Sequence, residues 1–344
     1  MSPAGCGRHA RLESRMTVKK LSLFLSQAAL AAALCTGAGA VPAQKGSYPD
    51  KPVRLVLPIA AGGGLDIVMR PLAQKLSESL KQAVVVDNRA GGGGTIGAAT
   101  IVRAEPDGYT IGGVSGSFAT NAATYKLPFD PLAVTLICMI GESGYLVTLP
   151  VATPFKSIKE LIAHAKANPG KLNYGSSGHG GSTHLATELF ELMAGVKMTQ
   201  VPYKSTGAVL TAMFVGEIQL IFGATMPSVV PQLKAGRVSV IGITTLKRSS
   251  LLPDVPTVAE SGVPGYEAVV WYGVLGPKGM PKDVVARLNR ELAAILRATD
   301  VRGRMAAEGL ELPDTTPDYF RKVLQRDVAK WSRVVKEGNI KVEQ

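Results

Sequence analysis

Two glycine-rich turns are the stretches of this chain best suited to hold a small anion. In the first, an apolar run at 55–59 is followed by three glycines (62–64) and then by apolar residues at the three- and four-residue spacing of a helix. The first turn of a helix leaves backbone N–H groups unpaired, its dipole favours negative charge, and glycine lets a ligand approach. We therefore predict a carboxylate site at this turn. The alternative is a tight strand-to-helix connection that binds nothing.

The second turn, at Gly175–Thr183, repeats this arrangement further along the chain. It follows a short predicted strand at 172–174 and opens a predicted helix from His184 to Met193. Its glycines and serines offer backbone amides and small hydroxyl groups to a ligand. His184, as a residue at the start of a helix, is expected to bond the loop beside it.

Enzymatic patterns are present only in part. A serine hydrolase needs a G-x-S-x-G turn, and Gly175–His179 misses it at the last residue, which leaves Ser177 with His184 as the alternative to a binding site. Gly92–Gly97 matches G-x-G-x-x-G but lacks the acidic residue that a dinucleotide site requires further on. With four histidines and no cysteine cluster, we expect no metal site and no cofactor.

The charge pattern fits the attraction of small anions better than nucleic-acid binding. The 344 residues carry a formal net charge of +12, of which +4 lies in residues 1–40. The basic residues are scattered and are not clustered with aromatic residues, so we expect no nucleic-acid partner. Cys138 lies in an apolar run, which is typical of a core residue.

The N-terminus is predicted to be a secretory signal peptide spanning residues 1–40. Lys19 and Lys20 precede an apolar run at 21–34 that is too short to span a bilayer comfortably, and Ala38-Gly-Ala40 supplies the small residues of a cleavage site. We therefore expect a periplasmic protein whose mature chain begins at Val41, which N-terminal sequencing would show.

Predicted strands and helices alternate along the rest of the chain, which is typical of α/β units with mostly parallel sheets. We predict two lobes, each a mixed, mostly parallel sheet flanked by helices. The first comprises 46–147 and the returning segment 270–344, which contains predicted helices at 281–298 and 317–337, and the second comprises 148–269. Two lobes joined by two crossings form a hinged cleft, in which a ligand is expected to bind and on which the lobes are expected to close.

A set of short stretches, specific in combination, runs through nearly the whole chain from about 48 to 340. These stretches are Tyr48–Arg54, Ala60–Arg70, Asn88–Gly94, Pro106–Thr110, Tyr174–Gly178, His184–Leu185, Val201–Lys204, Arg248, Leu252–Glu260 and Trp271–Gly273. Together they resemble the periplasmic solute-binding receptors of tripartite tricarboxylate transporters, also called Bug receptors. The resemblance implies a two-lobed, type II-like periplasmic binding-protein fold without enzymatic activity. Such a protein captures a small carboxylate-bearing metabolite and delivers it to the permease subunits of a membrane transporter.

The resemblance also implies that backbone amides and small hydroxyl groups, and no arginine clamp, hold the carboxylate. The residues that we predict to contact the ligand are Ala61, Gly62, Gly63, Gly64, Asp66, Ser115, Asn121, Ser176, Ser177, Gly178, Ser182, Thr183 and Thr225. We expect a monomer. Three positions depart from the family's pattern, namely Ser205 for a usual glycine, Gln219 for a frequent aspartate, and Pro71 in the first helix. The first two leave the identity of the ligand open.

Overall fold

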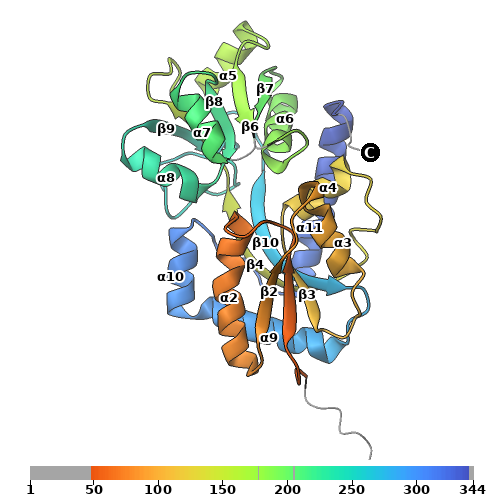
Figure 1. The fold of residues 1–344 in the computed structure, drawn as a ribbon. Coiled ribbons are helices and arrows are strands. Elements are labelled where there is room, and N and C mark those ends of the chain that lie inside the picture. Colours follow the sequence, from red (N-terminus) through yellow and green to blue (C-terminus); the bar gives the residue numbers. More distant parts are fainter. Residues whose placement is uncertain (1–47, 177, 204–205, 341–344) are drawn as a thin grey trace, which may run out of the picture. The chain divides into compact units, whose positions relative to one another are not determined.

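The computed structural model describes residues 48–176, 178–203 and 206–340 (Figure 1). The predicted signal peptide at 1–40 lies outside the described residues, as do Ser177 and Ser205. The described residues from Pro49 onward form one compact unit. No helix in its described part is both long enough and apolar enough to cross a bilayer.

The first sheet contains five strands in the order β2-β1-β3-β10-β4. Their bounds are β1 (Val53–Leu57), β2 (Val84–Asn88), β3 (Thr110–Ser115), β4 (Val134–Gly144) and β10 (Val269–Pro277). β1 pairs in parallel with β2 and β3, whereas β10 runs antiparallel to both β3 and β4. The sheet is therefore mixed, with β10 opposed to the other strands.

The second sheet repeats this arrangement with the order β7-β6-β8-β5-β9. Its strands are β5 (Leu146–Pro150), β6 (Asn173–Ser176), β7 (Thr199–Pro202), β8 (Leu220–Ala224) and β9 (Val238–Ile243). β6 pairs in parallel with β7 and β8, whereas β5 runs antiparallel to β8 and β9. β6 thus corresponds to β1, β7 to β2, β8 to β3 and β5 to β10, so the two glycine-rich turns follow corresponding strands.

Helices come from the segments between these strands and from the C-terminal part of the chain. In the segments that form the first sheet they are α2 (Gly64–Leu80), the short 3₁₀ helix η1 (Gly92–Gly94), α3 (Thr95–Val102), α4 (Ser117–Thr124), α9 (Lys282–Arg297), α10 (Thr299–Ala307) and α11 (Pro317–Glu337). In the segments that form the second sheet they are α5 (Ile158–Ala167), α6 (Ser182–Ala194), α7 (Thr206–Phe214) and α8 (Met226–Lys234).

The chain passes from the first sheet to the second between β4 and β5, which only Tyr145 separates, and returns between β9 and β10. The lobe boundaries that we predicted at 147/148 and 269/270 fall inside β5 and β10. The division of the chain into lobes stays a prediction.

Buried aromatic side chains build a hydrophobic cluster that includes residues from both sheets. Trp271 of β10 is fully buried and donates from Nε1 to Asp327 Oδ2 at 2.9 Å. Tyr266 is also fully buried and donates from its hydroxyl to the carbonyl of Ala186 in α6 at 2.8 Å. Because these polar atoms are paired, the aromatic groups can be buried without an unsatisfied donor. They support the strands and helices from which the two turns project.

The two predicted C-terminal helices are confirmed as α9 and α11, but α10 between them was not predicted. α10 is short, contains Gly303, and buries only Val301 and Met305. Such a segment shows too little apolar periodicity to indicate a helix. Its position matters for the site, because Glu308 and Leu310, which follow α10, line a cavity that is described below.

Candidate ligand-binding site

The first glycine-rich turn leaves three amides at the start of α2 without acceptors in the helix. Gly62 has φ +80°, a left-handed value that favours glycine, and Gly63 is the N-cap with φ −73° and ψ 163°. The first helical hydrogen bond runs from Ile67 N to Gly63 O at 3.0 Å, and Gly63 N donates to Ala60 O at 3.2 Å. No side chain caps the helix. The N–H groups of residues 64–66 are therefore the unpaired donors of this turn.

Asp66 holds this turn together with a carboxylate that is buried. Its Oδ2 accepts from Gly62 N–H at 2.9 Å, and its Oδ1 accepts from Arg70 at 2.6 Å and from Asn88 Nδ2 at 3.1 Å. Burial alone raises the pKa of Asp66, but hydrogen bonds from Arg70, Gly62 and Asn88 outweigh burial and hold that pKa below its usual value. The Asp66 carboxylate and the Gly62 amide are thus bonded to each other, and the carboxylate also to Arg70 and Asn88. Both groups were predicted to contact the ligand.

The second turn has nearly the same backbone. Gly180 has φ +70°, and Gly181 is the N-cap of α6 with φ −72° and ψ 166°. Leu185 N donates to Gly181 O at 3.0 Å as the first helical hydrogen bond, and no side chain caps α6. Gly180 N–H donates to His184 Nδ1 at 3.0 Å. The prediction that His184 bonds the loop beside it is confirmed.

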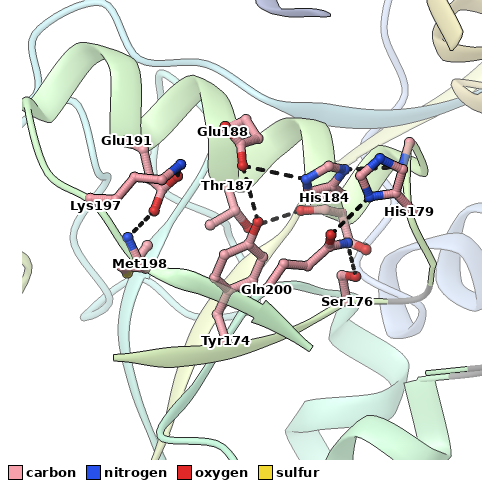
Figure 2. A network of polar contacts seen from close by, with 12 residues as sticks. Tyr174, Ser176, His179, His184, Thr187, Glu188, Glu191, Lys197, Met198 and Gln200 are labelled. Atoms are coloured by element: carbon pink, nitrogen blue, oxygen red, sulfur yellow. Dashed lines mark hydrogen bonds and ion pairs between the residues drawn. The ribbon is translucent and has the colours of Figure 1, made fainter. Parts of the chain in front are cut away.

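His184 begins a chain of polar contacts that leads into the protein (Figure 2). Because Nδ1 accepts a hydrogen bond, the ring carries its proton on Nε2, which contacts Glu188 Oε1 at 3.3 Å. Tyr174 OH donates to the same Glu188 oxygen at 3.4 Å. His184 is 3% exposed. Both of its ring nitrogens are engaged and the ring is buried, so the hydrolase alternative with Ser177 gains no support from this geometry.

The polar side chains of the second turn are also paired within the protein. Ser176 is buried, and its Oγ donates to Gly178 O at 3.3 Å and accepts from Gln200 Nε2 at 2.7 Å. The Ser182 side chain lies close to the hydroxyl of the buried Tyr145 and counters the rise that burial causes in the pKa of Tyr145. Thr183 packs closely against Gly223 of β8. These contacts occupy groups that we predicted to face a ligand.

A cavity of about 320 Å³ opens beside the first turn. Its lining includes Gly64, the first residue of α2, and Thr225, the N-cap of α8, which are the two predicted ligand residues found here. The other lining residues are Ile67, Val68, Ser143, Pro227, Ser228, Val270, Tyr272, Glu308 and Leu310. Apart from Gly64, the predicted residues Ala61, Gly62, Gly63 and Asp66 belong to the adjoining turn. None of the described residues of the second turn lines the cavity.

Ser115 and Asn121 lie in a different place. They line a separate space of about 10 Å³ together with Gly94 and Pro58. Asn121 Nδ2 donates to Gly93 O at 2.9 Å, and the Ser115 and Ser117 hydroxyls are 2.9 Å apart. A space of this size holds at most one water molecule. The structure therefore does not bring these two predicted residues to the main cavity.

Tyr272 is one of the lining residues that were not predicted from the sequence. Side chains alternate along a strand, so Tyr272 points away from the core that receives its neighbour Trp271. A Cβ at Gly64 would lie 3.5 Å from the Tyr272 hydroxyl, which places that hydroxyl beside the start of α2. The sequence could have indicated that Tyr272 faces away from the core, because it follows the core residue Trp271. It could not indicate a cavity on that face of β10, because tertiary packing forms the cavity.

Two of the three departures from the family pattern lie in the described residues, and neither lines this cavity. The Gln219 side chain accepts from Asn173 N–H at 2.9 Å and so connects two strands of the second sheet. Pro71 lies inside α2 and lines the neighbouring space next to α10. Ser205 is outside the described residues. In the described part of the chain, no group of three His, Cys, Asp or Glu residues could hold a metal ion.

The paired mixed sheets and the helix N-terminus at a cavity define a periplasmic binding-protein fold. The family model of the tripartite tricarboxylate transporter family receptor matches residues 68–340, and the chain belongs to that family. Its receptors are periplasmic solute-binding proteins.

Three similar proteins illustrate the family. BugT of Bordetella pertussis is 32% identical over 314 residues, which cover 90% of this chain and 96% of BugT. An R. palustris protein solved with adipate is 34% identical, with a TM-score of 0.76 and coverage of 86% of this chain and all of that one. MatC from Rhodopseudomonas palustris, solved with bound malate, is 29% identical, with a TM-score of 0.72 and coverage of 84% and 100%.

Proposed function

We propose that this chain is an extracytoplasmic receptor that binds a small carboxylate in the cavity lined by Gly64, Thr225 and Tyr272. The observation that carries this proposal is the start of α2, where uncapped amides open onto the cavity at Gly64. The protein would act as a monomer without catalysis and would deliver its ligand to the permease subunits of a tripartite transporter. Secretion through the signal peptide at 1–40 belongs to the same proposal.

Physical chemistry supports a carboxylate at this position. Unpaired amides and the helix dipole both favour negative charge at the first turn of α2. The Tyr272 hydroxyl lies beside those amides and can donate a further hydrogen bond. Hydrogen bonds to a charged group contribute about 1.5–3 kcal/mol each. The acids held by the two R. palustris proteins, adipate and malate, support the same ligand class.

The supporting scaffold explains why these amides stay available. Asp66 accepts from Gly62 N–H and is itself held by Arg70 and Asn88, so the turn is fixed without a side-chain cap on α2. A preorganised turn loses less conformational freedom when a ligand binds. We therefore propose the start of α2 as the principal carboxylate contact.

The test removes one backbone donor and leaves the helix intact. Proline is tolerated at the first position of a helix, and the extended conformation of Gly63 suits a residue that precedes proline. Gly64→Pro should therefore keep the fold and weaken binding by roughly 10- to 150-fold. Gly64→Ala is the matched control, because it keeps the N–H and its Cβ makes only an ordinary contact with Tyr272.

The measurement is titration calorimetry with the tightest acid from a panel of small mono- and dicarboxylates and amino acids. The proposal expects wild-type affinity for Gly64→Ala and the stated loss for Gly64→Pro, with matching circular dichroism spectra. It fails if no acid in the panel binds the wild type, or if Gly64→Pro binds as tightly as Gly64→Ala.

A further inference from the structure

Glu308 places a negative charge in the wall of the same cavity. The residue directly follows α10, is partly buried, and lines the cavity together with Tyr272 and Leu310. Among the described residues, no ion pair or hydrogen bond reaches its carboxylate. Arg304 lines the adjoining space between α2 and α10, and Lys75 there pairs with Asp300 at 2.6 Å. The Glu308 carboxylate is thus a group that a ligand could pair with.

Tyr272 lies between this carboxylate and the start of α2. Its hydroxyl is next to Gly64, as described above. Burial, and then the charge of Glu308, raise the pKa of Tyr272 to about 12, so the phenol stays protonated and can donate a hydrogen bond. The cavity therefore has hydrogen-bond donors at Gly64 and Tyr272 and a negatively charged hydrogen-bond acceptor at Glu308.

Apolar side chains form much of the remaining wall. These side chains are Ile67, Val68, Pro227, Val270 and Leu310. They favour a ligand with a hydrocarbon body, because each hydroxyl group placed against such a wall would lose its hydrogen bonds to water. A second carboxylate near Glu308 would meet a like charge in a partly desolvated site, whereas an ammonium group would meet an opposite charge.

We propose that this receptor selects an amino acid with an apolar body, whose carboxylate binds at α2 and whose cationic nitrogen pairs with Glu308. This inference rests on the proposed function, since it places the ligand in the same cavity. It makes Glu308 a specificity-determining residue that favours a zwitterion over a dicarboxylate of equal length.

The experiment compares matched ligands by calorimetry. Each dicarboxylate from succinate to suberate is paired with the ω-amino acid of the same chain length, so that only the second charged group differs. For the wild type, the dissociation constant of the best ω-amino acid should be at least about tenfold lower than that of its dicarboxylate partner. Glu308→Gln should remove this preference by weakening the amino acid and strengthening the dicarboxylate.

Glu311→Gln is the control variant, because Glu311 lines a neighbouring cavity and not this one. It should keep the wild-type preference. Equal or tighter binding of the dicarboxylates by the wild type overturns the inference and leaves the proposed function standing, as does an unchanged preference in Glu308→Gln. Failure of every acid to bind the wild type overturns the proposed function as well.

Discussion

Gly62 and Gly180 occupy corresponding places in the two glycine-rich turns, yet different side chains hold them. Each left-handed glycine donates its N–H to the residue four positions later, Asp66 in one turn and His184 in the other. Each of those residues in turn contacts a side chain four positions further along its helix. Asp66 contacts Arg70, and His184 contacts Glu188. The same backbone is therefore fixed once by a carboxylate and once by an imidazole.

The difference lies in where each chain of contacts leads. The side chain of Arg70 is 54% exposed, so the first chain ends at the surface, and the turn opens onto the cavity at Gly64. Glu188 is buried and lies near the buried Glu191, so the second chain ends in the interior. Two turns with nearly the same backbone conformation can therefore serve different functions. In the proposed function, the first turn is the one that presents amides to the ligand, and the second turn serves mainly as a structural support.

The largest expected effect comes from removing the two supporting side chains. Asp66→Ala and His184→Ala each leave a glycine N–H without its partner and should each lower the free energy of unfolding by about 1–3 kcal/mol. Asp66→Ala should in addition weaken ligand binding at least about tenfold, because it loosens the turn at the cavity. Chemical denaturation and calorimetry measure the two quantities. An equal loss of binding in both variants would contradict the assignment of different roles.

Removal of one amide from α6 sharpens the comparison further. Ser182→Pro is the counterpart of Gly64→Pro, since Gly181 has the same extended conformation as Gly63. We expect Ser182→Pro to reduce affinity by less than about fivefold, well below the loss expected for Gly64→Pro. Ser182→Ala, which keeps the amide, controls for the lost contact with Tyr145. A loss as large as that of Gly64→Pro would show that both turns hold the ligand equally.

The two turns should also differ in their response to pH. Burial, and then the charge of Glu188, raise the pKa of Glu191 to about 7. The native state therefore holds more protons than the unfolded state between about pH 4.3 and 7, and stability falls as the pH rises through that window. The pKa of Asp66 is lowered, so its contribution is present above the unfolded value of about 3.9 and is lost as the pH falls through the lower folded value.

Glu191→Gln isolates the response of Glu191, since the amide oxygen can still accept from Met198 N–H. Relative to this variant, the wild type should lose up to about 3 kcal/mol of stability between pH 5 and pH 8. Unfolding curves in denaturant across this range provide the measurement. A difference between the two proteins that is constant with pH would refute the raised pKa.

The sequence predicted the turns better than it predicted the cavity. Glycine runs after apolar strands indicate a strand–turn–helix connection because few other residues adopt the backbone of Gly62 or Gly180. The partners of those glycines lie only four residues further on, in the helix that the turn opens, and the helix-start role of His184 could be predicted for that reason. The contact from Asn88 to Asp66 could not, since it depends on the packing of β2 beside β1.

Residues distant in the sequence account for most of the missed site. Tyr272 and Glu308 reach the cavity only because β10 returns to the first sheet and α10 lies near α2. Ser115 and Asn121 were predicted to contact the ligand from the family resemblance, but their hydrogen bonds are made among β3, α4 and η1. Local pattern identifies available donors, whereas tertiary packing decides which of them remain unpaired.

The most direct test is a crystal structure of the protein with its tightest-binding acid. We expect a carboxylate oxygen within hydrogen-bond distance, about 2.7–3.2 Å, of Gly64 N and close to the Tyr272 hydroxyl. A carboxylate bound elsewhere, with Gly64 N–H left to solvent, would contradict the central claim that the start of α2 holds the ligand.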